Sequence, residues 1–489
     1  MNKLCRVTVL PCGSILSVPR GEKLSDVLRR EGLLTGAFCG GQGKCGKCTV
    51  MVNGQRLLAC RTEVSADMTV ELCSDSISVL TDSSEVSSVL PVRKGHLLAF
   101  DIGTTTVVGA LLDSDGRELA VEGRLNPQTS YGGDVVSRIR SASGGTLKEQ
   151  SDLIRTCLGD ISSVLCVRAG VSQEDIGTVS VVGNPAMQQL FLALPVDNLI
   201  SIPFRPVITK AAVTEAVQYL PGLKNAVLLT IPDISAYVGA DTVGCLLSSR
   251  MYECDELTLL VDIGTNGEMV LGNRERMFCC ATAAGPALEG ANIRFGMRAA
   301  AGAIDRVRAS EGRLLCHVIG GGMAKGICGS GLIDAAAAAM ELDLINRRGR
   351  IADGASIPLA DGVYLTQEDI RQLQSAKGAI AAGIAMLLEQ YGAEATDVDR
   401  VLLCGAFGSF LSVESACRIG LLPPVLREKT VSIGNAALSG AKLCAAGSED
   451  FFRTEQLARS VTPVELSALP RFQRSFAENM YFSVVKQAI

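Results

Sequence analysis

The beginning of the chain alternates apolar and polar residues in short runs separated by turn residues. The runs RVTVLP and SILSVP predict two strands, and KLSDVLRREG predicts a helix. Two further strands, TVMV and RLLAC, flank Asn53-Gly54, a pair typical of tight hairpin turns. Hairpin, helix and hairpin around a loop predict a small α+β domain of the β-grasp type over residues 1–80.

An internal repeat follows this domain. Residues 81–95, TDSSEVSSVLPVRKG, are rich in Ser and predict a linker. The segment LLAFDIGTTTVVGALLDSDGREL then begins at Leu97, and LTLLVDIGTNGEMVLGNRERM begins at Leu257. Each copy reads as strand, glycine turn, strand, polar turn and strand. The repeat predicts two similar α/β lobes with a cleft between them, lobe I over residues 96–250 and lobe II over residues 251–489.

Composition excludes several classes of function. The net charge is only −5 and no basic block is present, which argues against a nucleic-acid partner. No stretch reaches the roughly 18 apolar residues that span a bilayer, so we expect no membrane segment. The 18 cysteines occur without a secretory signal, which predicts a cytoplasmic protein with reduced thiols and metal ligands. With two histidines, a His-based metal site or a Ser-His-Asp triad is not expected.

Four cysteines near the N-terminus have the spacing of metal ligands. Cys39, Cys45, Cys48 and Cys60 form the pattern C-x5-C-x2-C-x11-C, with several glycines among the first three. Glycines allow the loop to wrap tightly and to point backbone N–H groups at the sulfurs. We expect these four thiolates to hold a plant-type [2Fe-2S] cluster. The alternative is a zinc site, which normally uses two spaced pairs and fewer glycines.

The paired DIGT segments suggest phosphate binding. In each copy an apolar strand ends in an acid, Asp101 or Asp262, and a glycine turn with hydroxyl groups follows. No Gly-Lys-Ser/Thr is present, so neither turn is a P-loop. We expect the two acids to be catalytic through Mg²⁺ and its waters, while the turns hold the phosphates of ATP. The predicted nucleotide-binding residues of the two turns are Gly103, Thr104, Thr105, Gly264, Thr265 and Asn266.

A third glycine turn occurs late in the chain. The segment VLLCGAFGSFL begins at Val401 and reads as a strand that runs into a turn with Gly405 and Gly408. Such a turn suits close approach of the backbone to an adenosine group. The alternative is a plain strand-to-helix turn.

The three turns together resemble the superfamily that unites actin, the heat-shock chaperone ATPases, sugar kinases and acetate kinase (ASKHA). The fusion to a ferredoxin resembles the ATP-dependent reductive activators of corrinoid proteins. This resemblance implies a β-grasp ferredoxin followed by a two-lobed actin-like (ribonuclease H-like) ATPase domain over residues 96–489. It covers essentially the whole chain, including NPQTSYGGDVVSRI from Asn126, GNPAM from Gly183, DISAYVGADTVG from Asp233, GPALEGANIRFGMRAAAGAI from Gly285 and CGSGLID from Cys328.

The resemblance also implies a function. The chain would use ATP to drive electron transfer from its [2Fe-2S] cluster to a Co(II) corrinoid protein of a methyltransferase system, restoring Co(I), and an upstream electron donor would refill the cluster. Three alternatives remain: a redox-sensing small-molecule kinase, an activator of radical dehydratases, and a filament former of the actin type. The dehydratase activators share one [4Fe-4S] cluster between subunits, which the four-cysteine ferredoxin disfavours.

Some points stay open at this level. In the fuller members of the corrinoid activators a long linker and a middle domain separate the ferredoxin from the first phosphate turn, whereas here only residues 81–95 lie between the ferredoxin and the strand before Asp101. This spacing indicates that the middle domain is missing and argues against a dimer built on it. Monomer and homodimer are both open. Glu289, Arg294 and Arg298 either face the nucleotide or partner, or pack between the lobes. The acid that orients the attacking water is Asp101, Asp262 or another residue.

Overall fold

The structure is a computed structural model. It describes residues 4–10, 13–31, 33, 43, 48–72, 90–352, 354, 356–405 and 410–483.

The N-terminal part forms a five-stranded sheet in the order β2-β1-β5-β3-β4. Helix α1 (Leu24–Arg30) buries Leu24, Val27 and Leu28 against the apolar positions of this sheet. The predicted first hairpin and helix are confirmed. The structure adds β5, which lies in the middle of the sheet, parallel to β1 and antiparallel to β3. The strands are β1 (Leu4–Leu10), β2 (Ser14–Pro19), β3 (Thr49–Val52), β4 (Gln55–Leu58) and β5 (Met68–Leu72).

Two six-stranded sheets follow, and they share the same connectivity in all but one strand. Their orders are β10-β11-β9-β6-β7-β8 and β21-β20-β12-β13-β14-β22. In each, three antiparallel strands begin the sheet and two later strands add in parallel beside the first of them, so the repeat seen in the sequence is a repeat of topology. The sixth strands differ, because β10 is antiparallel to its neighbour β11, whereas β22 is parallel to β14 at the opposite edge. The first sheet consists of β6 (His96–Ile102), β7 (Thr106–Leu112), β8 (Glu118–Leu125), β9 (Ile176–Gly183), β10 (Ala212–Glu215) and β11 (Val227–Thr230). The second consists of β12 (Thr258–Ile263), β13 (Gly267–Gly272), β14 (Met277–Thr282), β20 (Arg400–Cys404), β21 (Thr430–Ser432) and β22 (Val461–Pro463).

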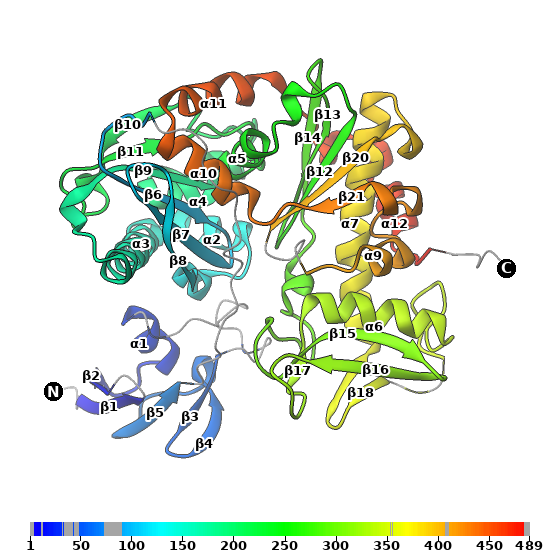
Figure 1. The fold of residues 1–489 in the computed structure, drawn as a ribbon. Coiled ribbons are helices and arrows are strands. Elements are labelled where there is room, and N and C mark those ends of the chain that lie inside the picture. Colours follow the sequence, from blue (N-terminus) through cyan, green and yellow to red (C-terminus); the bar gives the residue numbers. More distant parts are fainter. Residues whose placement is uncertain are drawn as a thin grey trace.

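Two helices lie between the six-stranded sheets, as Figure 1 shows: α5 (Ala240–Ser249) and α10 (Ala436–Ala446). One apolar cluster joins them to both sheets. The helices cross very closely, since a Cβ on Gly440 would lie 2.2 Å from the carbonyl oxygen of Gly244. Helix α10 packs on β6 and β9 of the first sheet, and α11 (Ser448–Ser460) packs on α5. The C-terminal part of the chain therefore returns to the first sheet.

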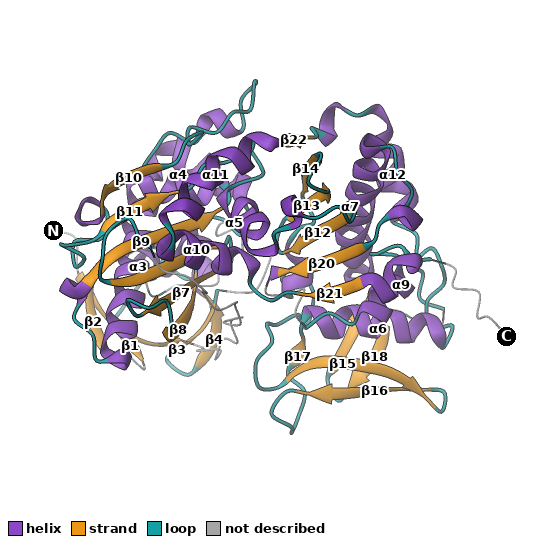
Figure 2. Ribbon diagram, turned by 45° about the horizontal axis from the view of Figure 1, so that its top comes forward, coloured by secondary structure: helices purple, strands orange, loops and turns teal. Residues whose placement is uncertain are grey.

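Helices α3 and α4 cover the outer face of the first sheet, and α7 covers that of the second (Figure 2). A small sheet, β15 to β17, packs against α6 below the second six-stranded sheet, and β18 and β19 form a hairpin beside it. Among the described residues, none of the helices combines the length and the apolar character needed to cross a membrane. These elements are α2 (Val135–Ser141), α3 (Leu147–Ala169), α4 (Pro185–Leu192), α6 (Gly329–Glu341), α7 (Gln367–Tyr391), α9 (Val413–Ile419), α12 (Pro470–Asn479), β15 (Ala303–Ser310), β16 (Arg313–Val318), β17 (Gly326–Ile327), β18 (Ser356–Ala360) and β19 (Val363–Thr366).

Candidate functional site

Asp101 and Asp262 occupy matched positions near the ends of β6 and β12. Side chains alternate along a strand, so Asp101 shares the face of Ala99, which packs in the cluster around α5 and α10. Asp262 shares the face of Leu260, which packs in the same cluster. The two predicted acids therefore face the same space between the sheets, and the structure brings them together.

Two further acids, Asp241 at the start of α5 and Glu268 on β13, lie beside this pair. Burial, and then the charges of Asp241 and Asp101, raise the pKa of Asp262 to about 7. Burial raises the pKa of Asp101 to about 7 against the lowering effect of Asn435, and Asp241 adds to the rise. The pKa of Glu268 is also raised, by burial first and then by Asp241 and Asp262. Carboxylates that repel one another in this way provide the oxygen ligands that Mg²⁺ prefers, so the donor set fits this ion.

The two DIGT turns meet directly. The Oγ1 atoms of Thr105 and Thr265 lie 3.1 Å apart. Both hydroxyl groups also donate to one oxygen, Oε2 of Glu289, at 2.5 and 2.8 Å. Glu289 follows β14 in the segment GPALEG. The sequence left two roles open for it, in the nucleotide site or in packing between the lobes, and the structure places it between the two turns. Arg294 instead stacks on Phe295 and Tyr364 within the second lobe.

Side chains of the first lobe hold the Gly103–Thr105 turn. Asn126 donates to the carbonyl oxygen of Gly103 at 2.8 Å, and Arg138 donates to that of Thr104. Asn184 accepts from the Met187 N–H as the N-cap of α4 and donates to Oγ1 of Thr104 at 3.1 Å. The turn is therefore positioned by hydrogen bonds.

The sequence analysis did not identify Asn435 as a residue of this site. It caps α10 by accepting from the Leu438 N–H at 2.8 Å, and its amide group donates to Oδ2 of Asp101 at 3.0 Å. The sequence does contain a pattern that indicates this role, because SIGNAALSG repeats the strand–Gly–Asn–helix order of the GNPAM segment that contains Asn184. Asp241 and Glu268 left no comparable signal.

The second turn is closed by a backbone hydrogen bond, and Gly405, the first glycine of the third turn, lies against Asp262. The Gly264 N–H donates to the carbonyl oxygen of Asn266 at 2.9 Å, which closes the second turn. Gly405 follows β20 with φ +83°, and a Cβ there would lie 2.2 Å from Oδ1 of Asp262. Gly405 thus leaves room for the acid. Gly408 lies outside the described residues.

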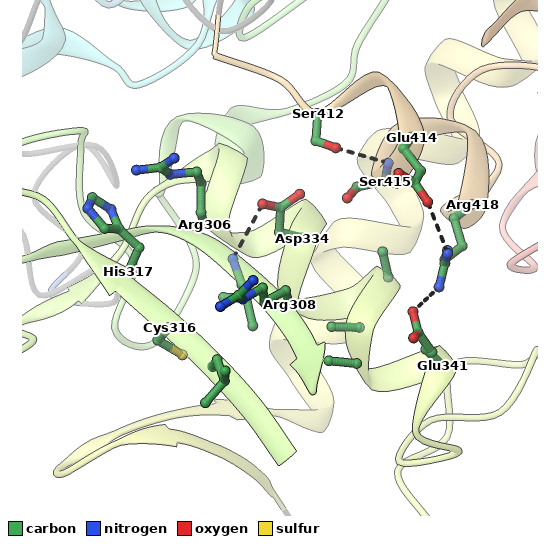
Figure 3. A pocket seen from close by; sticks show the side chains of 15 residues that line it. Arg306, Arg308, Cys316, His317, Asp334, Glu341, Ser412, Glu414, Ser415 and Arg418 are labelled. Carbon is green, nitrogen blue, oxygen red and sulfur yellow. Dashed lines mark hydrogen bonds and ion pairs between the residues drawn. The ribbon is translucent and has the colours of Figure 1, made fainter. Parts of the chain in front are cut away.

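A hollow of about 760 Å³ begins just after the third turn. It lies between β15, β16, α6 and α9, and Figure 3 shows Arg306 and Arg308 on one side and Ser412 and Ser415 on another. The buried Asp334 faces it and accepts a hydrogen bond from the Val307 N–H at 3.3 Å. No predicted phosphate residue lines this hollow.

Two of the four predicted cluster ligands are described. Cys48 and Cys60 are each 2 % exposed, and their Sγ atoms lie 3.2 Å apart. Cys48 directly precedes β3, and Cys60 lies in the turn that follows β4. Gly43 has φ +70°, a conformation that favours glycine. Cys39 and Cys45 lie outside the described residues.

Comparison with known families agrees with this arrangement. Residues 7–71 match the 2Fe-2S iron-sulfur cluster binding domain. Residues 97–254 match the RACo middle region, and residues 256–488 match the C-terminal domain of RACo, the ASKHA domain. The chain is 30 % identical to the corrinoid activation enzyme RamQ of Eubacterium limosum, over 96 % of this chain and 97 % of that protein. The chain belongs to the RACo family.

Two further proteins are similar to the chain over most of its length. The chain is 26 % identical to the [Co(II) methylated amine-specific corrinoid protein] reductase of Methanosarcina barkeri, over 71 % of this chain and 69 % of that protein. The solved structure of a reductive activator for corrinoid, iron-sulfur protein superposes with a TM-score of 0.75 at 26 % identity, over 98 % of each chain. The resemblance to reductive activators of corrinoid proteins and the ferredoxin-plus-ASKHA fold, both predicted from the sequence, are thus confirmed.

One expectation was wrong. The close spacing of Asp101 to the linker suggested that the middle domain is missing, but residues 97–254 are the RACo middle region. In this chain the matched region coincides with the first lobe and contains the first DIGT turn. The sequence gives no sign of a separate domain before the first DIGT turn, because that turn lies inside the matched middle region.

Proposed function

We propose that this protein uses ATP to drive single electrons from a [2Fe-2S] cluster onto a corrinoid protein, converting Co(II) to Co(I). The observation that carries the proposal is the fusion, in one chain, of a 2Fe-2S binding domain with two lobes whose DIGT turns meet. Relatives named for corrinoid activation and corrinoid-protein reduction match along most of its length. A homodimer and the identity of the electron donor stay outside this proposal.

ATP hydrolysis addresses an energetic problem. Plant-type clusters have potentials of about −400 mV. A partner whose Co(II)/Co(I) couple lies at a more negative potential would accept the electron only against this gap. Each ~59 mV of unfavourable gap lowers a one-electron equilibrium tenfold. ATP binding and hydrolysis would change how the lobes grip the partner and so make the transfer favourable.

The residues of the cleft would divide the work on ATP. Asp101 and Asp262 would hold Mg²⁺, with Asp241 and Glu268 beside them, and that ion neutralises phosphate charge when bound. The Thr105 and Thr265 hydroxyl groups would donate to phosphate oxygens. Glu289, which now accepts from both hydroxyls, occupies the place between the turns, and it would accept a proton from the attacking water once phosphate separates them.

The nucleoside would enter the hollow next to the third turn. That hollow begins at Ser412, a few residues after Gly405, and offers the guanidinium groups of Arg306 and Arg308 as flat surfaces for a base. Asp334 provides an acceptor for a hydroxyl or amino group there.

The cluster would be held by Cys39, Cys45, Cys48 and Cys60, and when bound it supplies one electron at a time. The chain's own contribution is to bury Cys48 and Cys60 side by side, because two sulfurs 3.2 Å apart are close enough to serve one iron. Their burial also limits the access of water to that side of the cluster.

The test is an anaerobic assay. The protein is pre-reduced and mixed with a Co(II) corrinoid methyltransferase protein, and the Co(I) absorption band is followed with and without MgATP. We expect Co(I) only with MgATP, no Co(I) with Cys48→Ser, and normal reduction with Cys5→Ser, a buried cysteine outside the predicted ligand set. No Co(I) with several corrinoid partners, despite an intact cluster and ATP hydrolysis, would contradict the proposal and favour a redox-sensing kinase.

A further inference from the structure

Two buried thiols lie against Asp262 between the six-stranded sheets. Cys245 is on α5, which packs on β9 of the first sheet. Cys404 ends β20 of the second sheet, where it pairs in register with Asp262. The two Sγ atoms are 3.9 Å apart, and Sγ of Cys245 is 3.8 Å from Oδ2 of Asp262. Two thiols and a carboxylate from three separate elements thus meet at one point.

We propose that Cys245, Cys404 and Asp262 form a binding site for a thiophilic divalent cation such as Zn²⁺. A tetrahedral zinc ion with Zn–S bonds of about 2.3 Å holds two sulfur ligands about 3.8 Å apart. The observed 3.9 Å fits this separation. The three potential ligand atoms all lie within 4.8 Å of one another, as three corners of a slightly enlarged tetrahedron. The fourth corner is left for water.

The ligand types distinguish this site from the neighbouring group of acids. Asp101, Asp241 and Glu268 offer oxygen only, which suits Mg²⁺, whereas a pair of sulfurs selects softer ions. On binding, each thiol would release its proton to solvent and coordinate as thiolate. In the absence of a metal, the same thiols form weak hydrogen bonds, Cys404 to Cys245 and Cys245 to Asp262.

Occupation of this site would inhibit the ATPase, an effect that rests on the proposed function. Asp262 cannot serve a cysteine-bound cation and the Mg²⁺ of MgATP with the same geometry. The cation would also tie α5 to β20 and so restrain the two sheets against each other. We therefore expect zinc to act as an inhibitor that competes for one acid of the cleft.

Metal content tests the site without reference to activity. Cluster-loaded protein is treated with a chelator under anaerobic conditions, equilibrated with Zn²⁺ and desalted, and zinc and iron are counted by mass spectrometry. We expect about one zinc more in the wild type than in Cys245→Ser/Cys404→Ser, at equal iron. Loss of the two thiolates should weaken zinc binding by more than about 100-fold, above the 10–100-fold that outer partners of a metal ligand contribute.

The matched control is Cys279→Ser, a buried cysteine on β14 in the same apolar cluster, which should keep the zinc. A Cys245→Ala/Cys404→Ala variant with thermal melting separates loss of ligands from misfolding. ¹¹³Cd NMR of the cadmium form should report a mixed sulfur and oxygen donor set. Zinc inhibition of ATP hydrolysis should be at least tenfold weaker in the double variants.

Three results would contradict the proposal. Equal zinc in the wild type and both double variants would overturn the site. Loss of the same two free thiols on exposure to air, with oxygen as the oxidant, and no uptake of zinc under anaerobic conditions would indicate a disulfide instead. Zinc bound at this site with unchanged ATP hydrolysis would overturn the inhibitory role. If the wild type hydrolysed no ATP, the proposed function would fail while the zinc count still decided the site.

Discussion

Asn435, at the start of α10, donates a hydrogen bond to Oδ2 of Asp101, at the end of β6, over 3.0 Å. The same side chain caps α10. One asparagine therefore joins the helix between the two sheets to an acid of the cleft, and it opposes the rise in the pKa of that acid.

Asn435→Ala should raise the pKa of Asp101 further, because it removes the bond that favours the charged carboxylate. We expect the acidic limb of the pH profile for ATP hydrolysis to move to higher pH, and the loss of the cap to cost about 0.5–2 kcal/mol of stability. Asn184→Ala removes a similar cap from α4 without touching Asp101, so its profile should not move. Equal profiles for both variants would refute the role of Asn435.

Glu289→Gln should separate binding from hydrolysis. The amide is neutral, so it competes less with phosphate for the Thr105 and Thr265 hydroxyls, and ATP should bind at least as tightly. It accepts protons poorly, so hydrolysis should fall by about 10²–10⁴-fold. Calorimetric titration with ATP and single-turnover hydrolysis measure the two effects. A variant with normal hydrolysis would show that Glu289 links the two turns and takes no part in hydrolysis.

The buried acids should make stability depend on pH in the absence of Mg²⁺. The pKa values of Asp101 and Asp262 are about 7 in the folded chain, above the ordinary value of 3.8 for an exposed aspartate. The folded chain then binds more protons than the unfolded one, so this stabilisation is present below pH about 4 and is lost as the pH rises to about 7. Melting curves should show Mg²⁺ raising Tm more at pH 7.5 than at pH 5.5. Asp101→Asn/Asp262→Asn should flatten this difference; an equal effect of Mg²⁺ at both pH values would argue against the site.

Gly405→Ala should disturb Asp262 as well as the backbone. The new methyl group would meet Oδ1 of that acid, and the positive φ adds about 1–3 kcal/mol of strain. Gly362→Ala is the control, because Gly362 has a similar φ of +77° in the β18–β19 turn but no neighbour within 4 Å. Both variants should lose stability, and only Gly405→Ala should need more Mg²⁺ for ATP hydrolysis. Similar Mg²⁺ requirements would contradict this.

The sequence predicted the parts of the site that lie on repeated strands. A continuous apolar run before Asp101 and before Asp262 predicted a buried strand that ends in an acid, and the repeat showed that two such turns exist. Asp241 and Glu268 were missed because nothing in a single helix or strand reveals which acid will be buried beside another. Strand β5 was missed because Val70 is its single fully buried residue, so its apolar pattern is weak. The role of α10 depends on a return of the chain that no local pattern encodes.

The return of the chain to the first lobe affects how the protein folds during synthesis. Helix α10 covers β6 and β9, and Leu90, at the end of the linker, exchanges backbone hydrogen bonds with Ala446 and Ser448. The first lobe cannot complete its core until the last part of the chain has left the ribosome. Its nascent sheet must therefore wait, with an apolar face exposed, while the second lobe is made, and such intermediates are prone to aggregation. Productive folding of this protein should be sensitive to translation speed and to chaperones that cover apolar surfaces.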